Sequence, residues 1–148
     1  MTEQRIIHGL IDILRYKESY QQETAGLLPQ DMYVLERIFF AGSIYPKELS
    51  EEYKLPPSTL TGIIDRLEKK SLIERLRVEN NRRAILLQVT KAGRGLVEGH
   101  IKEDKIFVEN LLSNLSEERR RLFIELLGEL VSSVDTQELF KEVCNASS

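Results

Sequence analysis

The sequence has few of the residues that mark secreted, metal-binding or catalytic proteins. Its single cysteine, Cys144, excludes an internal disulfide framework and is typical of the reducing cytoplasm. Because Cys144 lies so near the end of the chain, an incidental thiol is favoured over a redox sensor. The two histidines, His8 and His100, are far apart, which argues against a metal site and against general acid–base catalysis. We therefore expect no enzyme activity, no cofactor and no metal.

Long apolar runs and a secretory signal are also missing. No stretch approaches the roughly 20 apolar residues that cross a bilayer, and the first residues are too polar for the hydrophobic segment of a signal peptide. The expected location is the cytoplasm, without a membrane partner. The length of 148 residues and the hydrophobic content of 41% suffice for one compact domain or one intimate dimer.

An overall positive charge is absent too, since the net charge is −3, but the charge is unevenly distributed. Residues 46–94 contain 11 Lys and Arg against 7 Asp and Glu, a net charge of +4, whereas the rest of the chain has a net charge of −7. Salt screens charges over roughly 8 Å, so a local basic surface can attract phosphates although the whole chain is acidic. The basic segment is therefore the candidate binding surface.

The spacing of apolar residues predicts the secondary structure. A period of three to four predicts helices at residues 6–20, 30–41, 46–53 and 57–70. Two β-prone runs follow, at 72–78 and 84–89, with residues 79–82 as the tip of a hairpin. Thr90 and Ser116 are good caps for two further helices, and the last helix has a broad apolar face that needs a partner. The tail after Asn145 is expected to be disordered. The predicted fold class is mainly α with a small β-hairpin wing: a winged helix-turn-helix plus a helical dimerisation domain.

Residues 49–93 resemble the multiple antibiotic resistance regulator (MarR) family. The resemblance depends on Ser58-Thr59-Leu60-Thr61, Ile64-Asp65-Arg66-Leu67-Glu68-Lys69-Lys70, Arg82-Arg83-Ala84 and Val89-Thr90-Lys91-Ala92-Gly93. It implies one domain over residues 1–148, with a DNA-binding lobe at 30–93 and a dimerisation region at 1–25 and 94–140. It further implies a homodimer whose two lobes contact adjacent major grooves. The family contains repressors more often than activators, commonly released by a small aromatic or lipophilic ligand.

Two positions depart from the family pattern. Asn81 stands where the family usually has an acidic residue that braces a wing arginine, and although Asn81 can accept a hydrogen bond it cannot form the ion pair. Pro56-Pro57 stands where a polar cap is more usual, although proline is tolerated in the first turn of a helix.

Short polar side chains at the start of the 57–70 helix indicate contact with bases. A helix in a major groove needs such side chains near its N-terminus, because bulky ones hold the backbone away from the base edges. Candidates are Ser58, Thr59, Thr61 and Gly62, of which the serine and threonines alternatively serve only as helix caps. Glycine costs roughly 1 kcal/mol relative to alanine inside a helix, and close approach to DNA would explain that cost.

Arginines provide the remaining candidate contacts with DNA. Arg66 is expected to point outward to a phosphate or a guanine, with a weak surface ion pair as the alternative. Arg82 and Arg83 at the hairpin tip are expected to enter a minor groove, Arg83 above all, and the alternative is a solvated turn. Arg75 and Arg77 are candidate phosphate contacts.

The expected partners follow from the family architecture. A dimer should recognise a pseudo-palindromic duplex with half-sites about 10 bp apart. The expected dimerisation residues are Leu10, Leu14, Leu122, Leu126 and Leu130. An effector cleft would be lined by Tyr16, Tyr20, Met32, Phe39, Phe40 and Tyr45, although core and dimer packing is the better interpretation for Phe39 and Phe40. The main alternative function is a winged-helix protein-interaction module that does not bind DNA.

Overall fold

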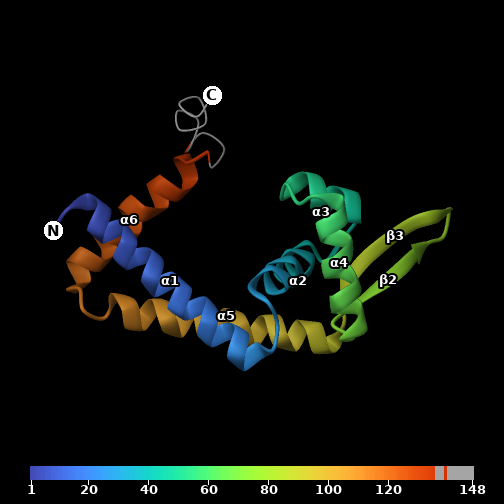
Figure 1. Ribbon diagram of the computed structural model, residues 1–148, viewed down its shortest axis with the longest axis horizontal. Coiled ribbons are helices and arrows are strands. Elements are labelled where there is room, and N and C mark those ends of the chain that lie inside the picture. The colour runs from blue at the N-terminus through green and yellow to red at the C-terminus, as the bar shows by residue number, and fades with distance from the viewer. Residues whose placement is uncertain (136–138, 140–148) are drawn as a thin grey trace. The chain divides into compact units, whose positions relative to one another are not determined.

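A three-stranded antiparallel sheet and three short helices form the winged lobe, which we define as residues 29–89 (Figure 1). In the computed structural model the described residues are 1–135 and 139, without the side chain of Arg82. The elements of the lobe are α2 (Pro29–Ala41), β1 (Ser43–Ile44), α3 (Pro46–Glu52), α4 (Pro57–Lys69), β2 (Ile73–Val78) and β3 (Asn81–Val89). Three longer helices complete the described chain, α1 (Glu3–Ala25), α5 (Lys91–Leu112) and α6 (Glu117–Ser133). The predicted fold class is confirmed. Cys144 and the tail after Asn145 lie outside the described residues, as do residues 136–138 and 140 of the predicted dimerisation region.

The core of the lobe is formed by the apolar faces of its helices and by the inner face of the sheet. Fully buried side chains come from α2, α3, α4, β3 and the first turns of α5, and they include Leu35, Ile38, Leu49, Ile63, Leu67, Leu87 and Val97. In α4 the buried residues recur at the helical period, so the opposite side of that helix is left to solvent.

The sheet differs from the predicted hairpin in two ways. The two-residue strand β1 pairs with β3, so the strand order is β1-β3-β2. A strand this short has no alternating pattern, and sequence analysis missed it. In addition, β3 begins at Asn81, so Arg82 and Arg83 belong to the strand and only residues 79–80 form the turn. Figure 1 shows β2 and β3 as a ribbon that extends away from α4.

The start of α5 is packed against the turn that follows α4. Thr90 caps α5 as predicted, since its Oγ1 accepts a hydrogen bond from the Gly93 amide at 3.0 Å. The same hydroxyl donates to the carbonyl of Ser71 at 2.7 Å, and the Thr90 amide donates to the carbonyl of Leu72 at 3.0 Å. A Cβ atom at Gly93 would lie 2.0 Å from that Leu72 oxygen, so only glycine fits. This junction explains why the motif around Thr90 ends in glycine.

Gly93→Ala is expected to lower the free energy of unfolding by about 2 kcal/mol, because backbone has to move to make room for the methyl group. The matched control is Gly95→Ala in the same helix, where an added Cβ meets nothing within 4 Å. That control should raise stability by up to about 1 kcal/mol, because alanine is the better helix former. Urea denaturation followed by circular dichroism measures both. Equal stabilities of the two variants would contradict the tight junction.

Two compact units divide the chain, Met1–Phe107 and Val108–Ser148, and α6 belongs to the second. In α1 the apolar side chains of Ile6, Ile7, Leu10 and Leu14 are each between 42% and 54% exposed. No residue of α6 is buried, although the helix carries Leu122, Phe123, Leu126, Leu127, Leu130 and Val131. Among the described helices, none has the length and apolar character needed to span a lipid bilayer.

Candidate nucleic-acid interface

The N-terminal turns of α4 present short polar side chains to solvent. Ser58, Thr59 and Thr61 are all exposed. The N-cap of α4 is Pro56 and no side chain caps the helix, so the alternative interpretation of Ser58 as a cap is wrong. The Thr61 hydroxyl donates to the carbonyl of Pro57 at 2.8 Å, which leaves its oxygen lone pairs as acceptors. Apart from that bond, the polar groups here are available to a ligand.

Gly62 lies on the same side of α4, and the fold does not require it to be glycine. A Cβ atom built there would meet only Nη1 of Arg66, at 3.5 Å, which is an ordinary van der Waals contact. This situation is the opposite of that at Gly93. The cost of glycine inside the helix therefore has no explanation in the packing of the lobe.

Arg66 is held by a buried carboxylate instead of pointing freely outward, which corrects the direction expected from the sequence. Its Nε donates to Oδ2 of Asp31 at 2.9 Å and its Nη2 donates to Oδ1 at 2.7 Å. The Asp31 side chain is 3% exposed and that of Arg66 is 46% exposed. The hydrogen bond to Asp31 raises the pKa of Arg66 above its usual value. This bidentate pair joins α2 to α4 and fixes the rotation of α4 about its own axis.

Arg75 is likewise engaged within the lobe. Its Nη2 lies 2.5 Å from a carboxylate oxygen of Asp65, and its Nε lies 3.0 Å from one of Glu68. Two carboxylates of α4 thus surround one guanidinium of β2, which attaches the wing to the helix. They also neutralise the charge that a phosphate would attract, so the predicted phosphate contact at Arg75 is not favoured.

The wing contains a bulge at its arginines. Arg77 pairs with Ile85, whereas its neighbour Val78 pairs with Asn81, so residues 82–84 face no partner on β2. The side-chain oxygen of Asn81 accepts a hydrogen bond from the backbone amide of Arg83 at 3.1 Å. Asn81 therefore accepts a hydrogen bond, as expected, but its donor is the backbone of the wing arginine.

Four basic side chains of the lobe keep their charge exposed. Among the residues that the structure describes, Lys54, Lys69, Arg77 and Arg83 are exposed and make no ion pair or side-chain hydrogen bond. Lys70 differs, because its ammonium donates to the carbonyl of Gly26 at 2.8 Å. The free positive charge is thus found in the turn between α3 and α4, at the end of α4 and on the two wing strands.

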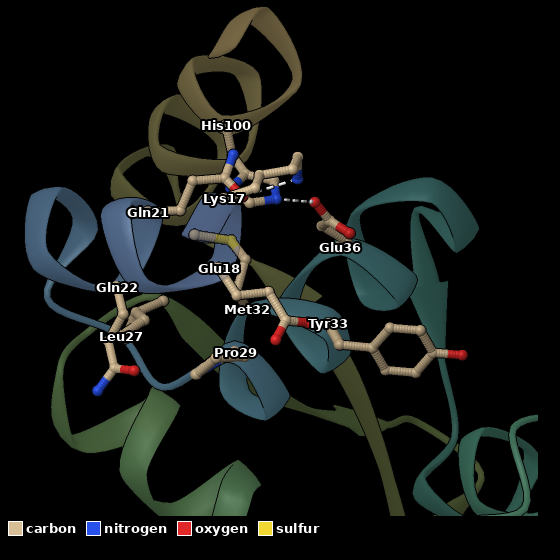
Figure 2. A pocket seen from close by; sticks show the side chains of 10 residues that line it. All are labelled: Lys17, Glu18, Gln21, Gln22, Leu27, Pro29, Met32, Tyr33, Glu36 and His100. Atoms are coloured by element: carbon tan, nitrogen blue, oxygen red, sulfur yellow. Dashed lines mark hydrogen bonds and ion pairs between the residues drawn. The ribbon is translucent and has the colours of Figure 1, made fainter. Parts of the chain in front are cut away.

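The predicted effector cleft is not brought together in the single chain. A cavity of about 170 Å³ lies between α1, α2 and α5, and Met32 is the only predicted residue that lines it (Figure 2). Tyr16, Tyr20 and Phe40 are more than half exposed. Phe39 packs against the core, as favoured from the sequence, and Tyr45 is the N-cap of α3. The other lining residues are mainly polar, among them Lys17, Gln21, Glu36 and His100.

His100 does not stand alone, contrary to the expectation from sequence spacing. Its Nε2 lies 3.0 Å from Oε1 of Glu36 and 3.7 Å from Oδ2 of Asp104. Lys17 and Gln21 both contact Oδ1 of Asp104, at 2.6 and 2.8 Å. Burial raises the pKa of the Asp104 carboxyl, but hydrogen bonds from Lys17 and Gln21 outweigh it, and the pKa lies below its usual value. Figure 2 shows Lys17, Gln21, Glu36 and His100 gathered on one side of the cavity, with the Tyr33 ring pointing away.

Two carboxylates with important contacts, Asp31 and Asp104, were not among the residues predicted from the sequence. Asp31 occupies the first turn of α2, where an acidic residue normally needs no partner beyond the helix dipole, so nothing in the sequence indicated its burial. Asp104 could have been found, because His100 and Asp104 are four residues apart and lie on one face of α5.

The lobe defines a winged helix-turn-helix protein, with α3 and α4 as the helix pair and β2 and β3 as the wing. The model of the MarR family matches residues 28–85 of the chain. A transcriptional repressor of Bacillus subtilis, MdtR, is 31% identical over 116 residues, which cover 78% of this chain and 75% of the relative. The crystal structure of FabT from Streptococcus pneumoniae in complex with DNA is 28% identical with a TM-score of 0.76, and covers 88% of this chain and 96% of that one. The YusO protein of B. subtilis is 27% identical with a TM-score of 0.77, over 88% and 93%. The chain therefore belongs to the MarR family of transcriptional regulators.

Proposed function

We propose that the protein is a cytoplasmic, homodimeric repressor that binds a pseudo-palindromic DNA duplex through α4 and the wing. The observation that carries this proposal is the exposed start of α4, where Ser58, Thr59 and Thr61 face solvent beside a glycine that the fold does not require. The sign of the local charge supports it, because Lys69, Arg77 and Arg83 have no acidic partner among the described residues. MdtR, a relative named as a repressor, and FabT, whose structure contains DNA, point in the same direction.

The residues of the interface divide into those that contact DNA and those that position α4 and the wing. Ser58, Thr59 and Thr61 contact base edges in the major groove, and Gly62 lets the helix backbone approach them. Arg83, on the bulge of β3, enters the adjacent minor groove, with Arg82 next to it in the strand. Lys69 and Arg77 contact phosphates. Arg66 and Arg75 are positioning residues, because their guanidinium groups bind Asp31, Asp65 and Glu68.

A second copy of the chain covers the apolar faces of α1 and α6. Exposed apolar stripes on helices mark interaction sites. The predicted dimerisation residues Leu10, Leu14, Leu122, Leu126 and Leu130 are each between 42% and 56% exposed in the single chain. Burial of these side chains between two subunits would set the distance between the two lobes, and hence the spacing of the half-sites.

Release by a small aromatic or lipophilic effector is part of the proposal. The exposed Tyr16 and Tyr20 of α1 supply the aromatic surface for such a ligand. A ligand that binds better to one spacing of the lobes shifts the dimer toward that spacing. Titration of the DNA complex with a panel of aromatic acids and fatty acyl compounds tests this part, and insensitivity to the whole panel would refute it.

Selection of bound sequences from random duplexes, at low and at physiological salt, tests the main proposal. Enrichment of one inverted repeat with half-sites about 10 bp apart is the expected result, together with a dimeric mass in light scattering. A stable monomer, or failure to bind any duplex at low salt, would overturn it. In that case the exposed surface of α4 would belong to a protein-interaction module.

Gly62→Ala is expected to have opposite effects on stability and on DNA binding. The free protein should gain up to about 1 kcal/mol, because alanine favours the helix and an added Cβ meets only the end of the Arg66 side chain. DNA affinity should fall about tenfold, because the methyl group holds the helix away from the bases. A loss of this size corresponds to one good base contact. Gly95→Ala gives the matched gain in stability without the loss of affinity. Unchanged affinity in Gly62→Ala would remove Gly62 from the interface.

A further inference from the structure

We propose that Glu36, His100 and Asp104 form a binding site for a first-row divalent transition metal ion of the Zn²⁺ class. The three residues lie in α2 and α5, and two of them, Glu36 and His100, line the cavity in Figure 2. One oxygen or nitrogen atom from each is within 4.8 Å of the other two. The proposal concerns metal binding by the chain itself and does not depend on the DNA-binding function.

The separations of the ligand atoms match a metal centre after small side-chain movements. Nε2 of His100 is 3.0 Å from Oε1 of Glu36 and 3.7 Å from Oδ2 of Asp104. Bonds of about 2.0 Å at tetrahedral angles place two ligand atoms roughly 3.3 Å apart. An ion between these atoms would replace the present contact of the imidazole with Glu36. The cavity of about 170 Å³ beside them gives room for a water molecule as the fourth ligand.

The outer contacts of both carboxylates orient one oxygen of each toward His100. Lys17 and Gln21 occupy Oδ1 of Asp104, which leaves Oδ2 directed at the imidazole. Nη2 of Arg37 lies 3.5 Å from Oε2 of Glu36, which leaves Oε1 directed at the same ring. In metal sites, ligating carboxylates are held by hydrogen bonds of this kind at the oxygen that does not bind the ion.

His100 is placed as a ligand by its burial. Its side chain is 12% exposed, and Nδ1 is buried with no hydrogen-bond partner among the described residues. The polar contacts of the ring are therefore those of Nε2 with the two carboxylates. The negative charges of Glu36 and Asp104 are balanced by Arg37 and Lys17, so the site has no excess positive charge that would repel a cation. A nitrogen with two carboxylate oxygens suits Zn²⁺, Co²⁺ or Mn²⁺ better than Ca²⁺, which prefers oxygen ligands alone.

Titration of the full-length, metal-free protein with Co²⁺ tests the proposal, because the visible absorption of Co²⁺ reports nitrogen and oxygen coordination directly. One Co²⁺ per chain, displaced by Zn²⁺, is the expected result. His100→Gln, Asp104→Asn and Glu36→Gln should each weaken binding by more than about tenfold. The matched control is His8→Gln, because His8 is an exposed histidine of α1 outside the cluster.

Thermal unfolding gives a second readout that does not depend on absorption. Zn²⁺ should raise the Tm of the unchanged protein and of His8→Gln, but not that of Asp104→Asn, because only an ion bound to the folded state stabilises it. Circular dichroism confirms that the variants are folded before they are compared. Failure to bind Co²⁺, binding that survives His100→Gln in a folded protein, or equal weakening in His8→Gln would each overturn the proposal.

Discussion

Arg66→Ala is expected to lower the free energy of unfolding several times more than the loss of an exposed, unpaired arginine of the lobe, because it removes the partner of a buried carboxylate. The loss arises at Asp31, whose carboxylate is 3% exposed and would remain in the core without its counter-charge. Arg66 itself is 46% exposed, so its own desolvation contributes little. Urea denaturation followed by circular dichroism measures the effect.

Two further variants separate this cause from a general loss of charge. Arg77→Ala removes an exposed guanidinium that makes no ion pair among the described residues and should change stability by less than about 0.5 kcal/mol. Asp31→Asn should cost less than Arg66→Ala, because the stranded Arg66 can be hydrated at the surface. A loss in Arg66→Ala no larger than in Arg77→Ala would show that the pair does not stabilise the lobe.

Arg83→Ala is expected to weaken DNA binding about 100-fold, on nearly all duplexes and without loss of stability. A dimer loses two minor-groove side chains, each worth on the order of 1–3 kcal/mol. The side chain is exposed, so its removal leaves no buried group unsatisfied. Fluorescence anisotropy with a selected duplex and a scrambled duplex, at several salt concentrations, measures the change in affinity.

The comparison with α4 gives the prediction its discriminating power. Thr61→Ala should alter the order of preference among duplexes, because Thr61 lies at the start of α4 and faces solvent. Arg77→Ala should weaken binding modestly and reduce the salt slope by about one, as expected for one phosphate contact. If Arg83→Ala and Thr61→Ala weakened every duplex equally, the division between minor-groove and base contacts would be wrong.

Hydrophobic periodicity predicted the helices of this fold well and its contacts poorly. The bounds of α2, α3 and α4 agree with the expected ranges to within one residue, because each helix begins at a proline, which suits the first helical turn. The helix caps at Thr90 and Ser116 were also correct. The partner of Arg66 could not be predicted, because Asp31 is 35 residues away and only the tertiary packing of α2 on α4 brings the two together.

The aromatic residues illustrate the same limit. The positions of Tyr16 and Tyr20 in the sequence place them on one helix, but periodicity does not distinguish a face covered by the same chain from one covered by a second subunit. Both are more than half exposed, and so is Phe40, whereas its neighbour Phe39 packs against the core. The contacts that His100 and Asp104 make with Lys17, Gln21 and Glu36 could not be predicted, because those three residues come from α1 and α2, far from α5 in the sequence.

The close packing at Gly93 couples the start of α5 to the turn that follows α4. Because the first turn of α5 is in direct contact with the Leu72 carbonyl, the helix cannot tilt at this point without moving its neighbour. His100 lies seven residues after Gly93 in the same helix. A ligand or ion that moved α5 at that level would therefore displace the turn at Ser71 and Leu72, and with it the C-terminal end of α4.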